Sequence, residues 1–175
     1  MACELLSAFW RKTPLALDYR PAPVEIRARR IGSDFGMGPA PHALLAVTLY
    51  AGVSGLILLG LAANTVKRRR LARVSIGDGE DPSLIRAMRG QANFVEYAPT
   101  GLFLLYLMAV IGTPAWVVHI FGLSFTGARA VHAWHFIQDD APGWQRFYGT
   151  VITFTCIGLA GTGLVAHAIA QMVFP

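Results

Sequence analysis

Charged residues are scarce in this chain. They make up 14% of its 175 residues, well below the roughly 25% of an average soluble protein. Apolar residues make up 54%, and the mean hydropathy is +0.48. This balance argues against a water-soluble domain and indicates a single polytopic membrane domain.

Cysteine is scarce as well. The two cysteines, Cys3 and Cys156, are separated by most of the chain, so they predict neither a disulfide framework nor a zinc knuckle. The histidines predict no metal site either, because most of them lie scattered at opposite ends of the apolar runs: His42, His119, His135 and His167. We therefore expect no metal cofactor.

Acidic residues are fewer than basic ones, 10 against 15, which gives a formal net charge of +5. A basic protein can bind nucleic acid, but here the basic residues form short runs beside apolar segments. Such flanks are typical of membrane-topology signals. We therefore expect membrane lipid, and no nucleic acid, as a partner.

Residues 1–41 contain no run long enough to cross a membrane and lack the apolar core of a signal peptide. They are rich in proline and arginine, which predicts a disordered or surface-lying N-terminal extension. One transmembrane domain over residues 42–175 would follow it. The alternative is that translation starts at Met37, so that residues 1–36 do not belong to the protein. Both interpretations stay open.

Four segments are long and apolar enough to cross a membrane as helices of about 20 residues or more. They cover residues 42–66, 83–111, 115–137 and 145–173. Short turns join them, and Asp81 followed by Pro82 predicts a capped start for the second helix. The expected fold is an all-α integral-membrane bundle of four transmembrane helices.

The basic run from Lys67 to Arg70 directly follows the first segment, which predicts that this loop lies in the cytoplasm. Four crossings then place both termini outside. The loop after the third segment returns to the cytoplasmic side.

The start of the second segment carries Arg86, Arg89, Asn93 and Glu96. On an α-helix these four residues fall within an arc of roughly 80°. Charges at membrane depth are costly and usually face a protein interior or a cavity, so this face is a candidate site. Simpler interpretations stay open: Arg86 as an interfacial anchor, and Arg89 with Asn93 as a hydrogen-bonded link between helices.

The third segment places Arg129 at a similar depth. Glu96 lies roughly 18 Å from the start of its helix, and Arg129 lies roughly 12 Å from the end of its own. The two side chains are expected to pair, within one subunit or between subunits. Direct contact of Glu96 with a ligand is an equal alternative.

Positive charge exceeds negative charge at this end of the bundle. Four arginines gather there against Glu96 alone: Arg86, Arg89, Arg129 and Arg146. Arginine suits bidentate recognition of carboxylates. The expected ligand is therefore a small polar anion that enters from the cytoplasm, with a lipophilic partner from the bilayer.

The motif Arg86-x-x-Arg89-x-x-x-Asn93-x-x-Glu96-Tyr97-x-Pro99, followed by Gly127-x-Arg129-x-x-His132, resembles the MAPEG family. These are membrane-associated proteins in eicosanoid and glutathione metabolism. The run Val74-Ser75-Ile76-Gly77-Asp78-Gly79 resembles the bacterial branch. The resemblance extends from about Pro41 to Phe174 and implies a bacterial inner-membrane homotrimer.

The resemblance also implies that glutathione binds between subunits, as a co-substrate. The residues it assigns to glutathione are Arg86, Arg89, Asn93, Glu96, Tyr97, Arg129, His132 and Tyr148, with Lys67 or Arg68 as a further contact. A nearby arginine would stabilise the reactive thiolate; Arg146 is the first candidate for this catalytic role and Arg129 the second.

Two positions depart from the better-known members of the family. Ala92 stands where they have an arginine, and Phe136 stands where they have a tyrosine. The leading hypothesis is a glutathione transferase or peroxidase for lipophilic electrophiles or hydroperoxides. The alternative is a non-catalytic binding or scaffold protein. A small transporter is disfavoured, because the chain shows no internal repeat.

Overall fold

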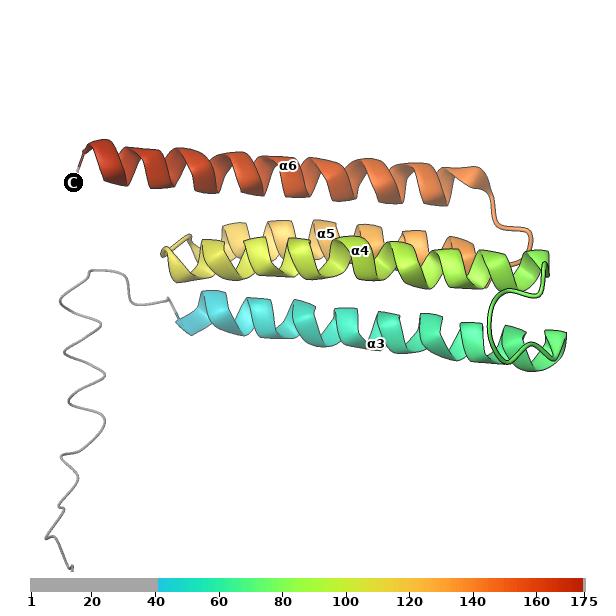
Figure 1. Cartoon of the computed structure of the whole chain (residues 1–175). Coiled ribbons are helices and arrows are strands. Elements are labelled where there is room, and N and C mark those ends of the chain that lie inside the picture. Colours follow the sequence, from blue (N-terminus) through green and yellow to red (C-terminus); the bar gives the residue numbers. More distant parts are fainter. Residues whose placement is uncertain (1–40, 175) are drawn as a thin grey trace, which may run out of the picture. The chain divides into compact units, whose positions relative to one another are not determined.

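The computed structural model describes residues 41–174, and the two interpretations of the N-terminal extension lie outside this range. Four α-helices follow one another: α3 (Pro41–Ala72), α4 (Pro82–Val110), α5 (Ala115–Ile137) and α6 (Gly143–Val173). They run alongside one another, and each helix is antiparallel to the one before it in the chain (Figure 1). The prediction of an all-α bundle with four helices is confirmed.

Helix boundaries agree closely with the sequence prediction, except at the end of the first helix. The α5 limits match, and α4 and α6 begin within two residues of the expected positions. Helix α3 continues past the expected Val66 to Ala72. Its extra turns are the basic run, because lysine and arginine are good helix formers and suit the negative end of the helix dipole.

Helices α4 and α5 form the centre of the bundle. Each of them packs against the three other helices, whereas α3 and α6 do not contact one another. Figure 1 shows the resulting order, with α3 and α6 on opposite sides of the central pair. We call the end at which α3 and α5 finish and α4 and α6 begin the basic end.

The bundle carries many large apolar side chains on its outside. Leu56 is 70% exposed and Leu123 is 67% exposed, as expected of helices whose surroundings are lipid. Three helices, α3, α4 and α6, are long and apolar enough to cross a membrane. Helix α5, the third of the four predicted spans, is not among these three; it carries Arg129 and three histidines. Since α5 is central, two of those histidines and Arg129 are buried against its neighbours.

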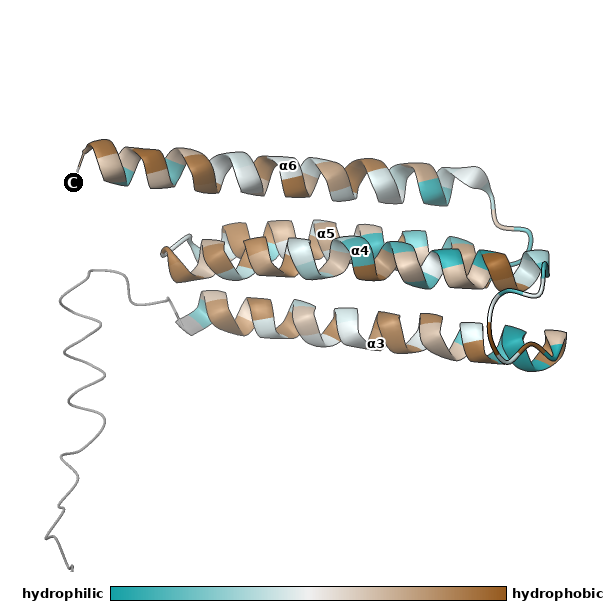
Figure 2. Ribbon diagram, viewed as in Figure 1, coloured by the Kyte–Doolittle hydropathy of each residue, from teal (hydrophilic) through white to brown (hydrophobic). Residues whose placement is uncertain are grey.

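The loop between α3 and α4 is held by hydrogen bonds from both sides. Arg69 Nη1 donates to the Gly77 carbonyl oxygen at 2.8 Å. Gly77 has a φ of +78°, a conformation that glycine adopts without strain. The predicted cap is confirmed: the Leu84 N–H donates to Asp81 Oδ1 at 2.8 Å, and Pro82 is the first helical residue. Hydrophilic residues gather toward this end (Figure 2).

Candidate functional site

Arg129 is the centre of the polar group between the helices. Its side chain is only 1% exposed. Its Nη2 donates to Asn93 Oδ1 of α4 at 2.7 Å and lies 3.4 Å from His132 Nδ1, one turn further along α5. The structure therefore brings together three of the predicted site residues.

Aromatic rings line the other sides of this guanidinium. Its Cζ lies 5.6 Å from the ring centre of Phe94 and 5.8 Å from that of Tyr97, distances at which a cation is attracted to a ring face. Tyr97 in turn packs against Phe154 of α6, with ring centres 5.3 Å apart. The Nε atom of Arg129 is buried and has no hydrogen-bond partner within the described residues.

The predicted pair between Arg129 and Glu96 does not form within the subunit. Over residues 41–174 the ion pair that does form joins Arg68 to Asp139, and Glu96 is exposed. The prediction matched the two depths along the helices but not their rotation: Asn93, not Glu96, faces Arg129. The buried cation thus has no carboxylate partner in its own chain as far as it is described, and a pair between subunits stays a prediction.

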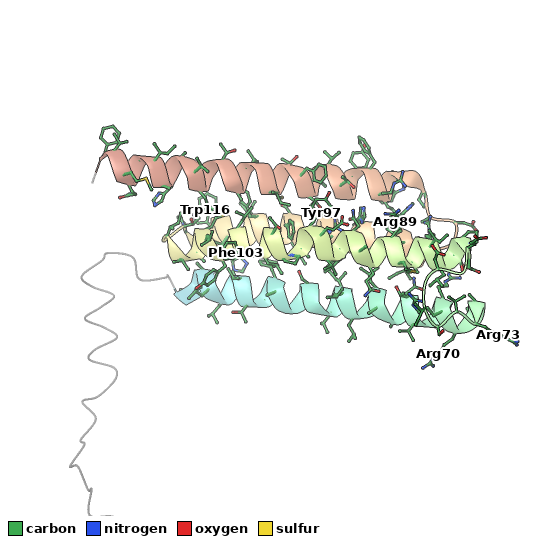
Figure 3. The ribbon with its side chains drawn as sticks, viewed as in Figure 1. Arg70, Arg73, Arg89, Tyr97, Phe103 and Trp116 are labelled. Carbon is green, nitrogen blue, oxygen red and sulfur yellow. The ribbon has the colours of Figure 1, made fainter. Side chains whose placement is uncertain are left out.

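Other predicted site residues lie at the surface of the subunit. Arg89 and Glu96 on α4, and Arg146 and Tyr148 on α6, are exposed. None of these four side chains has a hydrogen-bond or ion-pair partner in the part of the chain that the structure describes. Figure 3 shows Arg89 nearer the basic end of α4 and Tyr97 further along it. These four groups are free to meet a ligand or a neighbouring subunit.

Arg86 has a different environment. Its Nη2 donates to the His135 carbonyl oxygen and its Nε donates to the Gln138 carbonyl oxygen at 3.2 Å. Its guanidinium also lies 5.6 Å from the ring centre of Phe136. Arg86 therefore binds the end of α5, a partner that the sequence did not reveal.

The basic residues that close α3 also differ from one another. Arg68 Nη2 donates to Asp139 Oδ1 at 2.6 Å, in the turn between α5 and α6. Lys67 is exposed. Of the two residues expected to extend the site, Arg68 is therefore engaged within the chain.

Grooves lie between neighbouring helices of the bundle. A groove of about 500 Å³ between α3 and α4 is lined by Thr65, Arg69, Met88 and Gln91, among others. An apolar groove of about 260 Å³ between α5 and α6 is lined by residues such as Phe121, Ile152 and Cys156. Neither groove is lined by a predicted site residue, so the exposed residues of the predicted site lie outside both grooves within one subunit.

Metal chemistry gains no support from the histidines of this region. Within residues 41–174, no three histidine, cysteine, aspartate or glutamate side chains gather closely enough to hold a metal ion. The basic end offers arginine, amide and carboxylate groups. Arginine and amide groups recognise carboxylates and other anions, and a carboxylate recognises an ammonium group.

The fold and this polar group define an integral membrane protein built from a helical bundle. The MAPEG family model matches residues 47–166, more than half of the chain, and the chain belongs to this family. It is similar to the inner membrane protein YecN of Escherichia coli strain K12, with 36% identity over 88 residues, or 50% of this chain and 67% of that protein. YecN of E. coli O6:H1 matches equally well. The predicted resemblance is confirmed.

Proposed function

We propose that this protein binds glutathione at the basic end and adds it to lipophilic electrophiles. The observation that carries this proposal is the buried Arg129, which has no carboxylate partner within residues 41–174, together with the exposed arginines Arg89 and Arg146 toward the same end of the bundle. A buried charge without a counter-ion is strongly unfavourable. Such a site therefore favours a ligand that carries several negative charges.

Glutathione complements this set of charges group by group. Its reactive form carries two carboxylates, one thiolate and one ammonium group. Anionic groups of glutathione therefore meet the exposed Arg89 and Arg146, and the ammonium group meets Glu96. The buried Arg129 adds a further positive charge to the site. Arg86 is left out of this inventory because its donors bind α5 carbonyl oxygens.

A thiolate attacks where a thiol does not, and a cation beside the sulfur favours the thiolate. Arg146 is the better candidate for this role because it is exposed and without a partner in the described residues. With a chloroarene, the thiolate forms a C–S bond, and chloride leaves with the electrons of the C–Cl bond. With a hydroperoxide, two glutathione thiols become a disulfide as the hydroperoxide becomes an alcohol and water.

We further propose that the site is completed by a neighbouring subunit of a homotrimer in a bacterial inner membrane, open to the cytoplasm. The exposed Arg89 and Glu96 support this arrangement, because charged groups at membrane depth need partners. The groove lined by Arg69 and Gln91 lies at the same end, on another face of α4. A ligand bound to Arg89 and Glu96 of one subunit can therefore also contact this groove on a neighbouring subunit.

A non-catalytic binding protein is the second candidate. Phe136 favours it, because this ring packs against His132 and His135, at 5.2 Å from each, and offers no hydroxyl group to a thiol. Conjugation of a chromogenic chlorodinitroarene by the purified protein separates the two candidates. Turnover that is lost in Arg146→Ala supports the enzyme, and glutathione binding without turnover supports the binding protein.

A further inference from the structure

The turn between α5 and α6, residues 138–142, is held to the bundle by side chains of three helices. Arg68 of α3 forms an ion pair with Asp139. Arg86 of α4 binds the carbonyl oxygens of His135 and Gln138. His135 of α5 lies with its Nδ1 3.2 Å from the Pro142 carbonyl oxygen, which can only accept, so the ring donates. We call this set of contacts the turn clamp.

Arg86 is the strongest part of the clamp. The end of an α-helix leaves carbonyl oxygens without partners and carries partial negative charge. The two donors of one planar guanidinium bind two of these oxygens, a geometry that a lysine cannot reproduce. The ring of Phe136 beside the guanidinium adds a cation–π contact.

The clamp determines where α6 begins and how closely it approaches α5. No side chain caps the start of α6, so its first turn depends on the preceding turn for its position. Gly149 then lies so close to α5 that an added Cβ would be 2.8 Å from His132 Cβ. Arg146 and Tyr148 lie between the clamped turn and Gly149, so these two contacts determine where their side chains lie.

We propose that Arg86 is a positioning residue: by clamping the α5–α6 turn it places Arg146 and Tyr148 for the reaction, and it does not itself bind glutathione. This inference rests on the proposed function for its catalytic consequence only. The clamp itself is a property of the chain that can be measured without substrate. Arg86 and Arg89 are a matched pair for the test, one turn apart on α4: Arg86 binds carbonyl oxygens, whereas Arg89 is exposed and has no partner within residues 41–174.

The test compares Arg86→Lys with Arg89→Lys in the full-length detergent-purified protein. Hydrogen exchange is measured at residues 134–138 and 145–149, and glutathione affinity and kcat are measured on the same samples. In Arg86→Lys, exchange at both helix ends rises about tenfold or more, because a hydrogen bond to a charged group is lost. Its kcat falls roughly tenfold or more, since small misplacements are costly in catalysis, while glutathione affinity is kept. In Arg89→Lys, affinity falls and exchange is unchanged.

A charge exchange gives a second and milder test. Asp139→Arg alone should raise exchange at the turn by up to about fivefold, as expected for a partly exposed ion pair. Adding Arg68→Asp should restore the protection. This double variant keeps the net charge of the chain and leaves Arg86 in place.

The outcomes separate the clamp from the proposed function. If Arg86→Lys weakens glutathione binding as Arg89→Lys does and leaves both helix ends protected, Arg86 is a ligand residue and the inference is overturned. If the unaltered protein binds no glutathione, the proposed function fails. The hydrogen-exchange rates of Arg86→Lys then still test whether Arg86 holds the turn. Unchanged rates at the two helix ends overturn this inference, and raised rates support it.

Discussion

The basic end of the bundle and its opposite end are held together by different forces. At the basic end, Arg68, Arg86 and Arg129 reach across helices to oxygen atoms of other elements. At the opposite end, α3, α4 and α5 meet in an apolar cluster that includes Val47, Leu105 and Val118. The cross-helix polar link there, within residues 41–174, joins Tyr50 of α3 to His119 of α5 at 3.1 Å.

This difference favours the basic end as the site of the proposed function. Apolar packing is sufficient to hold helices together in lipid, and it tolerates many side chains. A buried charge is costly, so the burial of Arg129 near the basic end supports a binding task there. In the proposed function the opposite end serves as a scaffold. The variants below change one end at a time.

The largest effect is expected from Arg129→Met at the basic end. Glutathione affinity should fall by about tenfold or more, because the site loses a buried positive charge that attracts an anionic ligand. The fold should be kept or stabilised, since replacing buried unpaired charge with apolar atoms removes its desolvation penalty. Ligand titration and thermal melting measure the two effects. Loss of folding in Arg129→Met would show that this arginine is a structural link.

The next largest effect is expected on stability, from substitutions at two glycines of α6, Gly149 and Gly161. Gly149→Ala should destabilise by about 1–3 kcal/mol, because the new Cβ would meet the Cβ of His132 and the carbonyl oxygen of Ala128. Gly161, further along α6, has open space around it, so Gly161→Ala should stabilise by up to about 1 kcal/mol through helix propensity. Thermal melting in detergent compares the two. Equal effects of the two substitutions would mean that α6 approaches α5 no more closely at Gly149 than it does at Gly161.

At the opposite end, Tyr50→Phe removes the hydroxyl that meets His119. The expected loss is about 0.5–1.5 kcal/mol of unfolding free energy, the contribution of one hydrogen bond. Glutathione affinity should not change, because this link lies at the far end of the helices from Arg89 and Arg146. A loss of glutathione affinity in Tyr50→Phe would contradict the view that binding depends on the basic end alone.

The smallest effect concerns the cap of α4 and depends on pH. Hydrogen bonds from the Ser83 hydroxyl and the Leu84 N–H hold the pKa of Asp81 below its usual value of 3.8. A lowered pKa in the folded state means that the carboxylate stabilises the fold above the usual pKa. This contribution is lost as the pH falls through the lowered value.

Melting curves of Asp81→Ala and of the unaltered protein should therefore differ slightly at neutral pH and converge under acid. Asp81→Asn is the control, because asparagine also caps helices but does not titrate. Its melting temperature should follow the Asp81→Ala curve at a constant offset. A difference between Asp81→Ala and the unaltered protein that persists at low pH would contradict the assigned cause.

Local signals in the sequence predicted the fold well. Span length and charge placed the four helices, and the Asp81 cap followed from capping preferences of neighbouring residues. Contacts between helices were harder to predict, because they depend on rotation as well as on depth. The expected pairing of Arg129 with Glu96 had the right depth and the wrong face. The partner of Arg86 is a pair of backbone oxygens, which no side-chain pattern reveals.

The central claim is that the basic end binds glutathione through its exposed arginines, Arg89 and Arg146. Equilibrium binding of glutathione to the purified full-length protein tests it most directly, with Arg89→Ala beside Arg70→Ala, an exposed arginine at the same end but on α3. The account predicts that glutathione binds, that Arg89→Ala weakens binding by about tenfold or more, and that Arg70→Ala leaves it unchanged. Absence of binding, or equal loss in both variants, would contradict it.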